Sequence, residues 1–341
     1  MNTFEKDKKY VAATYKRFPV EIVTGQGSVV KDSAGKEYID MGSGFGNSGA
    51  EANECAIKVA RKYAADQRKA CHGDSDGQAP YVIVTLENSF HGRTLTTLAA
   101  TGQDHFHELF QPLTPGFAYA KANDIEELKK ILDQEQVAGV MIECVQGEGG
   151  VNPLEAEYVR EVRRLTQEKD IILIVDEVQT GNGRTGELYA YMNFGIQPDV
   201  VTTAKGLAGG LPLGATLLSE KVQDVLGFGD HGSTFGGNPV CCSAARSILS
   251  RIDEPLLAEV KEKSRYIFDA FDGADGVESV TGMGLMIGIK TVRPAGEVVA
   301  ACIEKGVLCL TAKDKVRLLP ALNIPWEVLK KAVGVILEAC K

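Results

Sequence analysis

The stretch "IILIVDEVQT" occupies residues 171–180, and it decides the fold of this chain. It starts with five consecutive apolar residues and then turns polar at Asp176. The preceding stretch, "EAEYVREVRRLTQEKD" (155–170), has the charged, periodic pattern of an amphipathic helix. A short, continuous apolar run after such a helix is typical of a strand that is buried on both faces. Residues 155–176 therefore predict one helix–strand unit of a parallel sheet.

The same alternation extends outward in both directions. Strand-like runs lie at 81–86, 138–145, 199–204 and 213–219, and a further capped helix is expected at 123–134. This alternation predicts an α/β fold with a mostly parallel large sheet covered by helices. Later in the chain the pattern changes to three helices, expected at about 255–272, 295–305 and 326–340, with "GLMIGIK" and "GVLCL" between them. These elements predict a smaller α+β C-terminal domain.

Composition and charge narrow the class of protein. The 341 residues carry a net charge of −9, which argues against a nucleic-acid or membrane surface as the main partner. The N-terminus has no apolar core of a secretory signal, and no apolar run is long enough to span a bilayer, so we expect a cytoplasmic protein. The eight cysteines form no C-x-x-C pair. We therefore expect reduced core thiols and no structural metal.

Two ionisable residues stand where predicted strands end. Ligands of open α/β sheets bind at the carboxyl ends of the strands. Lys205 follows "DVVTTA" and precedes glycines, so it could be an imine-forming amine. Taken alone, a solvated loop lysine is the more ordinary interpretation. Asp176 could hold a protonated ring nitrogen of a cofactor, or it could simply cap a helix or lie in a loop. Gln179 lies within reach of the same position.

The stretch "NSGAEANE" (47–54) has the pattern of a phosphate cradle. Ser48, Gly49 and Ala50 precede a helix that we expect from about Glu51. Backbone N–H groups at a helix start, next to a hydroxyl, bind phosphate well. The alternative is an ordinary serine N-cap.

Further candidates follow other strands. "NSFHGRT" (88–94) offers Phe90 as a ring that could stack on a flat cofactor and Arg93 as a carboxylate ligand, or else a core phenylalanine with a structural histidine beside it. "HGSTFGGNP" (231–239) offers Thr234 as a phosphate donor. "QGEGG" (146–150) places Glu148 in a glycine-rich loop. Each signal is weak alone, but together they place a lysine, an acid, a phosphate cradle and an aromatic ring at the strand ends of one sheet.

These motifs, in this order and together with "VRLLPAL" (316–322), resemble the class III aminotransferases, which depend on pyridoxal 5'-phosphate (PLP) and have fold type I. The resemblance runs from about Tyr15 to the C-terminus. "FHGRTLTTLAATGQ" and "FAYAKANDIEELKKIL" are most similar to the branch of that family that acts on N-acetylornithine in arginine biosynthesis. The resemblance implies three regions: an N-terminal segment that packs with the small domain (1–46), a large PLP-binding domain (47–252) and a small C-terminal domain (253–341).

The resemblance also implies a role for each candidate residue. Lys205 would bind PLP covalently, Asp176 would pair with the pyridine nitrogen, and Gln179 would contact the phenolic oxygen. Phe90 would stack on the ring. The phosphate would be held by Ser48, Gly49 and Ala50, with Thr234 donated by the neighbouring subunit of a homodimer with a shared active site. Substrate carboxylates would bind Arg93 and Arg317, with Glu148 pairing with Arg317 as a gate and Tyr15 near the substrate.

The implied reaction moves an amino group from an amine donor to 2-oxoglutarate in two half-reactions, with Lys205 as the base and acid that moves the proton. Two alternatives stay open at this point. One is a sister enzyme acting on ornithine, succinylornithine or 4-aminobutyrate. The other is a truncated PLP-binding protein with little or no turnover.

The truncation concerns the junction between Gly46 and Asn47. "MGSGFG" and "NSGAEA" adjoin here, whereas several tens of residues separate them in the family that the chain resembles. A few small residues must then bridge two domains, and each extended residue spans at most about 3.6 Å. We expect either a break in the coordinates at 46/47, or a continuous, shortened chain that binds PLP weakly, exposes apolar surface and has little activity.

Overall fold

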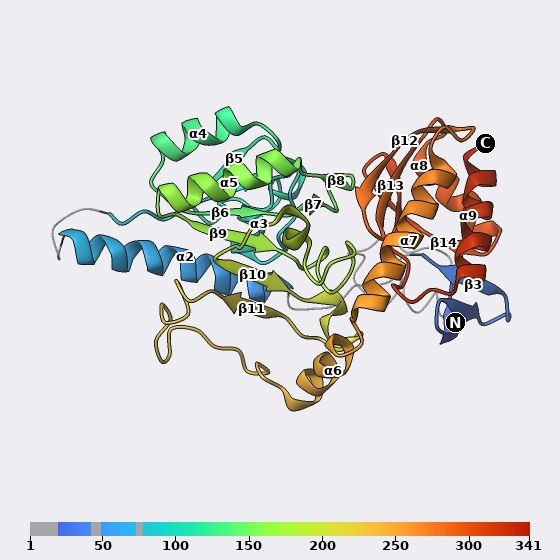
Figure 1. The fold of residues 1–341 in the computed structure, drawn as a ribbon, viewed down its shortest axis with the longest axis horizontal. Helices are drawn as coiled ribbons and strands as arrows, with labels where there is room; N and C mark the ends of the chain where they lie inside the picture. Colours follow the sequence, from blue (N-terminus) through green and yellow to red (C-terminus); the bar gives the residue numbers. More distant parts are fainter. Residues whose placement is uncertain (1–19, 42–48, 73–77) are drawn as a thin grey trace.

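The computed structural model describes residues 20–41, 49–72 and 78–341, and these form two lobes that lie side by side (Figure 1). The larger lobe contains a six-stranded sheet, and the smaller lobe contains the C-terminal part of the chain. Tyr15, Ser48 and the junction between Gly46 and Asn47 lie outside the described residues. The predicted break at that junction and the predicted roles of Tyr15 and Ser48 therefore stay predictions.

The strands of the large sheet have the order β11-β10-β9-β6-β4-β5. Five of them run parallel, and only β11 pairs antiparallel, with β10. The α/β prediction with a mostly parallel sheet is confirmed, although β5 was not foreseen because its half-buried "FAYA" lacks a continuous β-branched run. The strands span the following residues: β4 Val82–Leu86, β5 Phe117–Ala120, β6 Val137–Ile142, β9 Ile172–Asp176, β10 Val200–Thr203 and β11 Ala215–Leu218.

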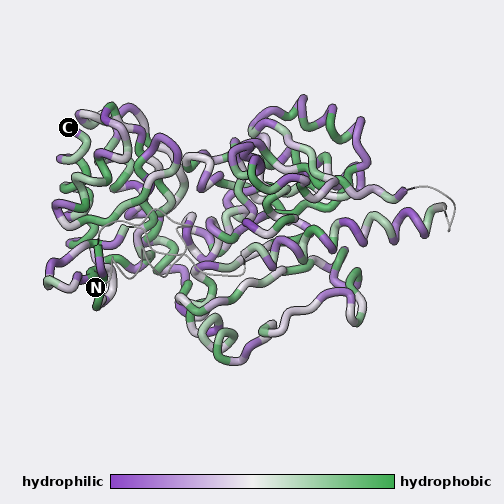
Figure 2. Tube along the Cα trace, turned by 180° about the vertical axis from the view of Figure 1, so that it is seen from behind, coloured by the Kyte–Doolittle hydropathy of each residue, from purple (hydrophilic) through white to green (hydrophobic). Residues whose placement is uncertain are grey.

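Helices cover both faces of this sheet. On one face lies α2 (Gly49–His72), whose hydrophilic and hydrophobic segments alternate along its length (Figure 2). On the other face lie α4 (Ile125–Gln134) and α5 (Ala156–Glu168) (Figure 1). Helix α2 begins two residues before the predicted start at Glu51 and extends to His72. Within the described ranges, no helix combines the length and apolar character needed to cross a membrane.

Shorter elements link the main strands and helices of the large lobe. The hairpin β7 (Val145–Gln146) and β8 (Asn152–Pro153) carries the "QGEGG" loop between its strands. The helices and 3-10 turns are α3 (Leu95–Ala100), η1 (Asp104–Phe106), η2 (Ala190–Phe194), η3 (Lys205–Ala208) and α6 (Pro239–Leu249).

The smaller lobe contains two sheets over a shared apolar core. One is antiparallel with the order β12-β13-β16-β15, and the other has the order β1-β2-β3-β14. Strand β3 pairs parallel with β14, Ile39 opposite Val307, so the N-terminal strands join the C-terminal lobe. This pairing supports the proposed packing of the N-terminal segment with the small domain. The elements are β1 Ile22–Gln26, β2 Val29–Asp32, β3 Glu37–Asp40, α7 Glu254–Phe271, β12 Val277–Met283, β13 Met286–Thr291, α8 Ala295–Glu304, β14 Val307–Leu308, β15 Leu310–Ala312, β16 Lys315–Leu318 and α9 Trp326–Cys340.

All eight cysteines are free thiols. Cys144, Cys302, Cys309 and Cys340 are buried, as expected for core residues, but Cys71 is exposed near the end of α2. The prediction of core thiols therefore holds for only part of the set.

Candidate active site

Lys205 and Asp176 lie at the carboxyl ends of neighbouring strands. Asp176 is the last residue of β9 and pairs in register with Thr202 on β10, and Lys205 lies two residues after the end of β10. The backbone of Lys205 has φ +47°, in the left-handed region that costs a non-glycine residue about 1 kcal/mol or more. Such strain persists where the surrounding structure holds it, and it is common at functional sites.

The carboxylate of Asp176 is anchored by three N–H groups. Its Oδ1 accepts a hydrogen bond from the backbone N–H of Val178 at 2.9 Å. Its Oδ2 lies 2.8 Å from His91 Nδ1 and accepts from Asn53 Nδ2, also at 2.8 Å. The side chain is buried, so these donors replace water around the charge. Burial alone would lower the pKa of His91, but the hydrogen bond and charge of Asp176 raise it above its ordinary value. The Asp176 carboxylate is therefore fixed in position beside a cationic or strongly polar partner.

Burial lowers the pKa of the Lys205 amine below its ordinary value. The negative charges of Asp176 and Glu148 act in the opposite direction, as does the carboxyl of Glu143. Burial wins, so the neutral amine, which is the nucleophilic and basic form, is easier to reach than for a solvated lysine.

Phe90 precedes His91, the histidine that meets Asp176, and is held by contacts of its own. The backbone N–H of Phe90 donates to Glu143 Oε2 at 2.9 Å, and its ring meets Phe106 edge to face, with 5.7 Å between centroids. Arg93 lies over the same two rings, with its Cζ 5.0 Å from the Phe106 centroid and 5.9 Å from that of Phe90. Burial raises the pKa of Glu143 to about 7, so this carboxyl is largely neutral in mildly acidic solution. Arg93 itself is exposed, which leaves its guanidinium accessible from solvent.

Glu148 and Arg317 form an ion pair between the lobes. Glu148 Oε1 lies 2.6 Å from Arg317 Nη1, and Gln179 Nε2 donates to the same oxygen at 3.4 Å. Burial opposes ionisation of Glu148, but Arg317 outweighs it and lowers the pKa of that carboxyl. Arg317 lies on β16 and is buried, so the pair joins the loop of the large lobe to a strand of the small one.

The start of helix α2 is pressed against the same loops. A Cβ added to Gly49 would lie 2.7 Å from Val178 Cγ1, and one added to Gly92 would lie 2.9 Å from the Cβ of Ala50. The first N–H groups of an α-helix have no partner within the helix and attract anions. Gly49 and Ala50 therefore place the helix end beside the loops that carry Gly92 and Val178.

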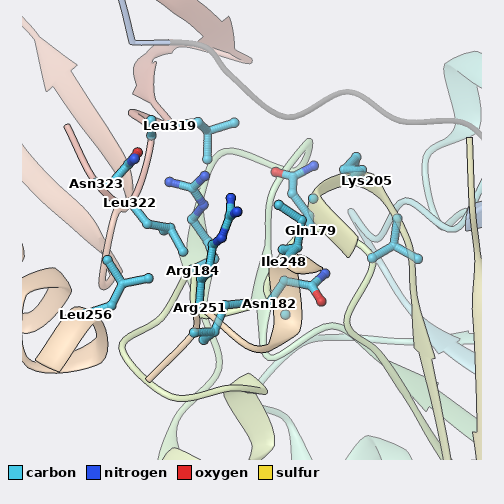
Figure 3. A pocket seen from close by; sticks show the side chains of 15 residues that line it. Gln179, Asn182, Arg184, Lys205, Ile248, Arg251, Leu256, Leu319, Leu322 and Asn323 are labelled. Carbon is cyan, nitrogen blue, oxygen red and sulfur yellow. The ribbon is translucent and has the colours of Figure 1, made fainter. Parts of the chain in front are cut away.

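A cavity of about 430 Å³ lies next to Lys205 (Figure 3). Lys205 and Gln179 lie at one end of it, and Leu256 and Asn323 lie on the opposite side (Figure 3). Its lining residues in the described part of the chain include the cations Arg184 and Arg251 and no carboxylate. The cavity therefore suits a ligand that carries negative charge.

Most of the predicted site residues lie together, and one does not. Lys205, Asp176, Gln179, Phe90, Arg93, Glu148, Arg317, Gly49 and Ala50 belong to the connected set described above. Thr234 lies in an exposed loop between β11 and α6, and within the described residues no hydrogen bond or ion pair joins it to that set. Sequence reasoning missed Asn53, although its place one helical turn after Gly49, in a stretch already singled out, was a usable signal.

The chain belongs to the class-III aminotransferase family. The Aminotransferase class-III family matches residues 45–340, which is most of the chain and includes every site residue described above.

Within this family, the chain is similar to acetylornithine aminotransferase from Haemophilus ducreyi. It is 42% identical to that protein over 387 positions that cover 97% of this chain and 96% of the relative. Among solved structures it is similar to ornithine aminotransferase from Toxoplasma gondii, with a TM-score of 0.91 and 28% identity over 99% of this chain and 94% of the other. It also resembles N-acetylornithine aminotransferase from Stenotrophomonas maltophilia, with a TM-score of 0.80 and 28% identity over 98% of each chain.

The alignment with the Haemophilus protein is longer than this chain. It spans 387 positions, whereas the chain has 341 residues, so at least 46 aligned positions are gaps in this chain. The relative therefore carries residues that have no counterpart here. This difference has the size of the missing segment predicted at 46/47, several tens of residues.

Proposed function

We propose that this protein is a PLP-dependent aminotransferase that transfers the terminal amino group of N-acetylornithine to 2-oxoglutarate, giving N-acetylglutamate semialdehyde and glutamate. One observation carries the proposal: a lysine with a lowered pKa and a triply anchored aspartate end neighbouring strands of one parallel sheet. The preference for N-acetylornithine over ornithine rests on the relatives named acetylornithine aminotransferase, of which the Haemophilus protein is 42% identical to this chain. The solved ornithine and N-acetylornithine aminotransferases are equally similar to it, at 28% identity each.

The residues present fit PLP. Two buried polar atoms, His91 Nε2 and Gln179 Oε1, lack a hydrogen-bond partner within the described residues, so polar capacity remains for a ligand. The helix end at Gly49 and Ala50 would hold the phosphate, Phe90 would cover the ring, Gln179 would meet the phenolic oxygen, and Asp176 would meet the pyridine nitrogen. When bound, PLP supplies an electron-withdrawing ring that makes the carbon next to the substrate nitrogen acidic.

The chain's own groups would then carry out binding and proton transfer. Lys205 would move the proton at the reacting carbon, since burial makes its neutral amine accessible. Asp176 would hold the proton on the ring nitrogen because its own position is fixed by three donors. Arg93 and Arg317 would bind substrate carboxylates, and the cationic cavity beside Lys205 would favour acidic substrates.

We also propose a homodimer with a shared active site. Thr234 lies in an exposed loop, away from the site of its own chain, together with exposed Phe228 and Phe235. An exposed loop with two large apolar side chains is suited to a subunit interface. Thr234 would then donate to the phosphate of the neighbouring subunit.

A panel of amine donors tests the proposed function. Purified protein is mixed with PLP, 2-oxoglutarate and one donor, and glutamate is quantified. We expect N-acetylornithine to give the highest kcat/KM, ahead of succinylornithine, ornithine and 4-aminobutyrate. A different order would reassign the substrate, and glutamate formation from none of them would reject the enzyme.

If no donor gives glutamate, the second candidate function applies, a PLP-binding protein with little turnover. It is favoured by the difference of at least 46 positions from the Haemophilus relative. The mass of the intact protein, measured together with activity, separates the two candidates. A mass that matches 341 residues with no turnover would support the truncated form, whereas the same mass with full activity on N-acetylornithine would reject it.

Glu148→Gln is expected to impair the two half-reactions unequally. The amine donor and the dicarboxylate acceptor need different charges at Arg317, and Glu148 neutralises Arg317 at 2.6 Å. Glutamine removes that charge, so we expect the half-reaction with N-acetylornithine to slow about tenfold or more, on the scale of a lost charged hydrogen bond, and the half-reaction with glutamate to change less. Single-turnover absorbance changes of the bound cofactor measure both rates. Glu187→Gln, which removes an acid paired with Lys261 outside the site, is the control. Equal losses in the two half-reactions would reject the gate.

A further inference from the structure

Asn53 is the centre of a buried polar cluster behind the candidate site. It lies in the second turn of α2 and is 1% exposed. Its Nδ2 donates to Asp176 Oδ2 at 2.8 Å and to the backbone oxygen of His91 at 2.7 Å. Its Oδ1 accepts from the hydroxyl of Thr202 at 2.6 Å. All of the polar atoms of this side chain are therefore engaged.

These partners fix which way the amide faces. The nitrogen meets a carboxylate oxygen and a carbonyl oxygen, which only accept hydrogen bonds, and the oxygen meets a hydroxyl, which can donate one. A flipped amide would place its oxygen against two acceptors in a buried environment, which is costly. The N–H of Asn53 is thus held toward Asp176.

Asn53 also connects the three elements that form the site. Its own helix begins at Gly49, its nitrogen contacts the end of β9, and its oxygen contacts Thr202 on β10, three residues before Lys205. Asn53 therefore links the helix end directly to the Asp176 carboxylate, in addition to the packing of Gly49 on Val178. A phosphate and a ring nitrogen that belong to the same rigid molecule require that the distance between the helix end and the carboxylate be fixed.

We propose that Asn53 is a positioning residue that aligns Asp176 with the start of α2, so that the carboxylate meets the ring nitrogen of a cofactor whose phosphate binds at Gly49 and Ala50. The inference rests on the proposed function for the identity of that cofactor. Asn53 acts through Asp176 and does not touch the reacting atoms.

The alternative is that Asn53 only ties α2 to the sheet. The neighbouring residue provides a matched control for that role, because the hydroxyl of Thr216 on β11 donates to the backbone oxygen of Ala52 at 2.9 Å. This bond also joins α2 to the sheet, but it does not involve Asp176. Thr216→Val loosens the same helix without changing the carboxylate.

Asn53→Leu keeps the shape of the side chain and removes its N–H groups. We expect its affinity for PLP, measured by absorbance and fluorescence titration of the apoprotein, to fall about ten- to hundredfold, the scale of a hydrogen bond to a charged group. Thr216→Val should change the affinity less than about threefold, although both variants lower the melting temperature. Equal affinities of the two variants would overturn the inference.

Asn53→Asp adds a second measurement, the pH dependence of PLP affinity, which would not change if Asn53 only tied α2 to the sheet. This variant also tests the inference if Asn53→Leu does not fold. The new carboxyl would face Asp176, with His91, Glu143 and Lys205 as the other charged groups nearby. Two adjacent carboxyl groups cannot both ionise easily. In acid the new carboxyl therefore keeps a proton that it can donate to Asp176, and at higher pH it ionises and repels Asp176.

The PLP affinity of Asn53→Asp relative to wild type should therefore be near normal at about pH 5 and fall toward pH 8, whereas that of Asn53→Leu stays flat. A flat ratio for the aspartate variant would contradict the inference. Wild-type protein that takes up no PLP would overturn the proposed function itself, and the inference with it. Wild-type binding with no difference between the leucine and valine variants would overturn the inference alone.

Discussion

Lys205→Ala is expected to abolish transamination and to leave the fold intact. The amine of Lys205 is the only group that the proposed function gives for both covalent attachment of PLP and proton transfer, so its removal leaves no substitute. The fold should survive because alanine meets the same backbone cost at φ +47° as lysine does, and no large apolar contact is lost. Glutamate formation measures turnover, and the melting temperature of the apoprotein measures the fold.

Two further variants make this result specific. Lys205→Arg keeps a cation at the same position, but a guanidinium stays protonated and cannot act as a neutral amine, so it should be as inactive as alanine. Lys221→Ala removes a lysine that pairs with Asp170 away from the site, and it should keep wild-type turnover. An active Lys205→Arg would show that only charge is needed, and normal turnover by Lys205→Ala would reject the assignment of the lysine.

The large sheet could be predicted because its strands are buried on both faces. The run at 171–175 is continuously apolar, and the helix before it has a clear charged face, so local pattern and tertiary burial agree. The "FAYA" strand β5 lies at the sheet edge and is half-buried, and its mixed sequence gives no comparable signal. The backbone of an edge strand pairs with only one neighbouring strand, which leaves the sequence of the edge strand less constrained.

The candidate site could be predicted where its residues follow strands or, as for Gly49 and Ala50, lie in a recognisable motif at a helix start. Lys205 and Asp176 stand at strand ends, where a local pattern places them. Asn53 lies inside a helix, and its importance depends on the helix crossing β9 and β10 at one particular height. That height results from the packing of α2 on the sheet, which no local sequence pattern encodes. The raised pKa of Glu143 likewise follows from burial in three dimensions.

Asp176→Asn is expected to leave cofactor binding measurable but to slow transamination about a thousandfold, the scale found when a preorganised electrostatic contact is removed. The carboxylate accepts from donors on both oxygens: Val178 N–H on Oδ1, and His91 and Asn53 on Oδ2. An amide has only one accepting oxygen, so its NH₂ group must face a donor on one side or the other. The negative charge that would hold a proton on the ring nitrogen is also lost. Neither the charge nor the orientation of Asp176 can therefore be kept by an asparagine.

A second buried aspartate separates this effect from a general loss of stability. Asp199 lies before β10, is buried, and pairs with Arg163 at 2.9 Å, away from Lys205. Asp199→Asn should lower the melting temperature, since Arg163 loses its partner, but the folded fraction should turn over at the wild-type rate. Asp176→Asn is also expected to lower the melting temperature, because its NH₂ group faces a buried donor, but in addition its folded fraction should show a large loss in kcat. A mild loss of kcat in Asp176→Asn would mean that the carboxylate mainly organises the loop through Val178, and the ring-nitrogen role would have to be abandoned.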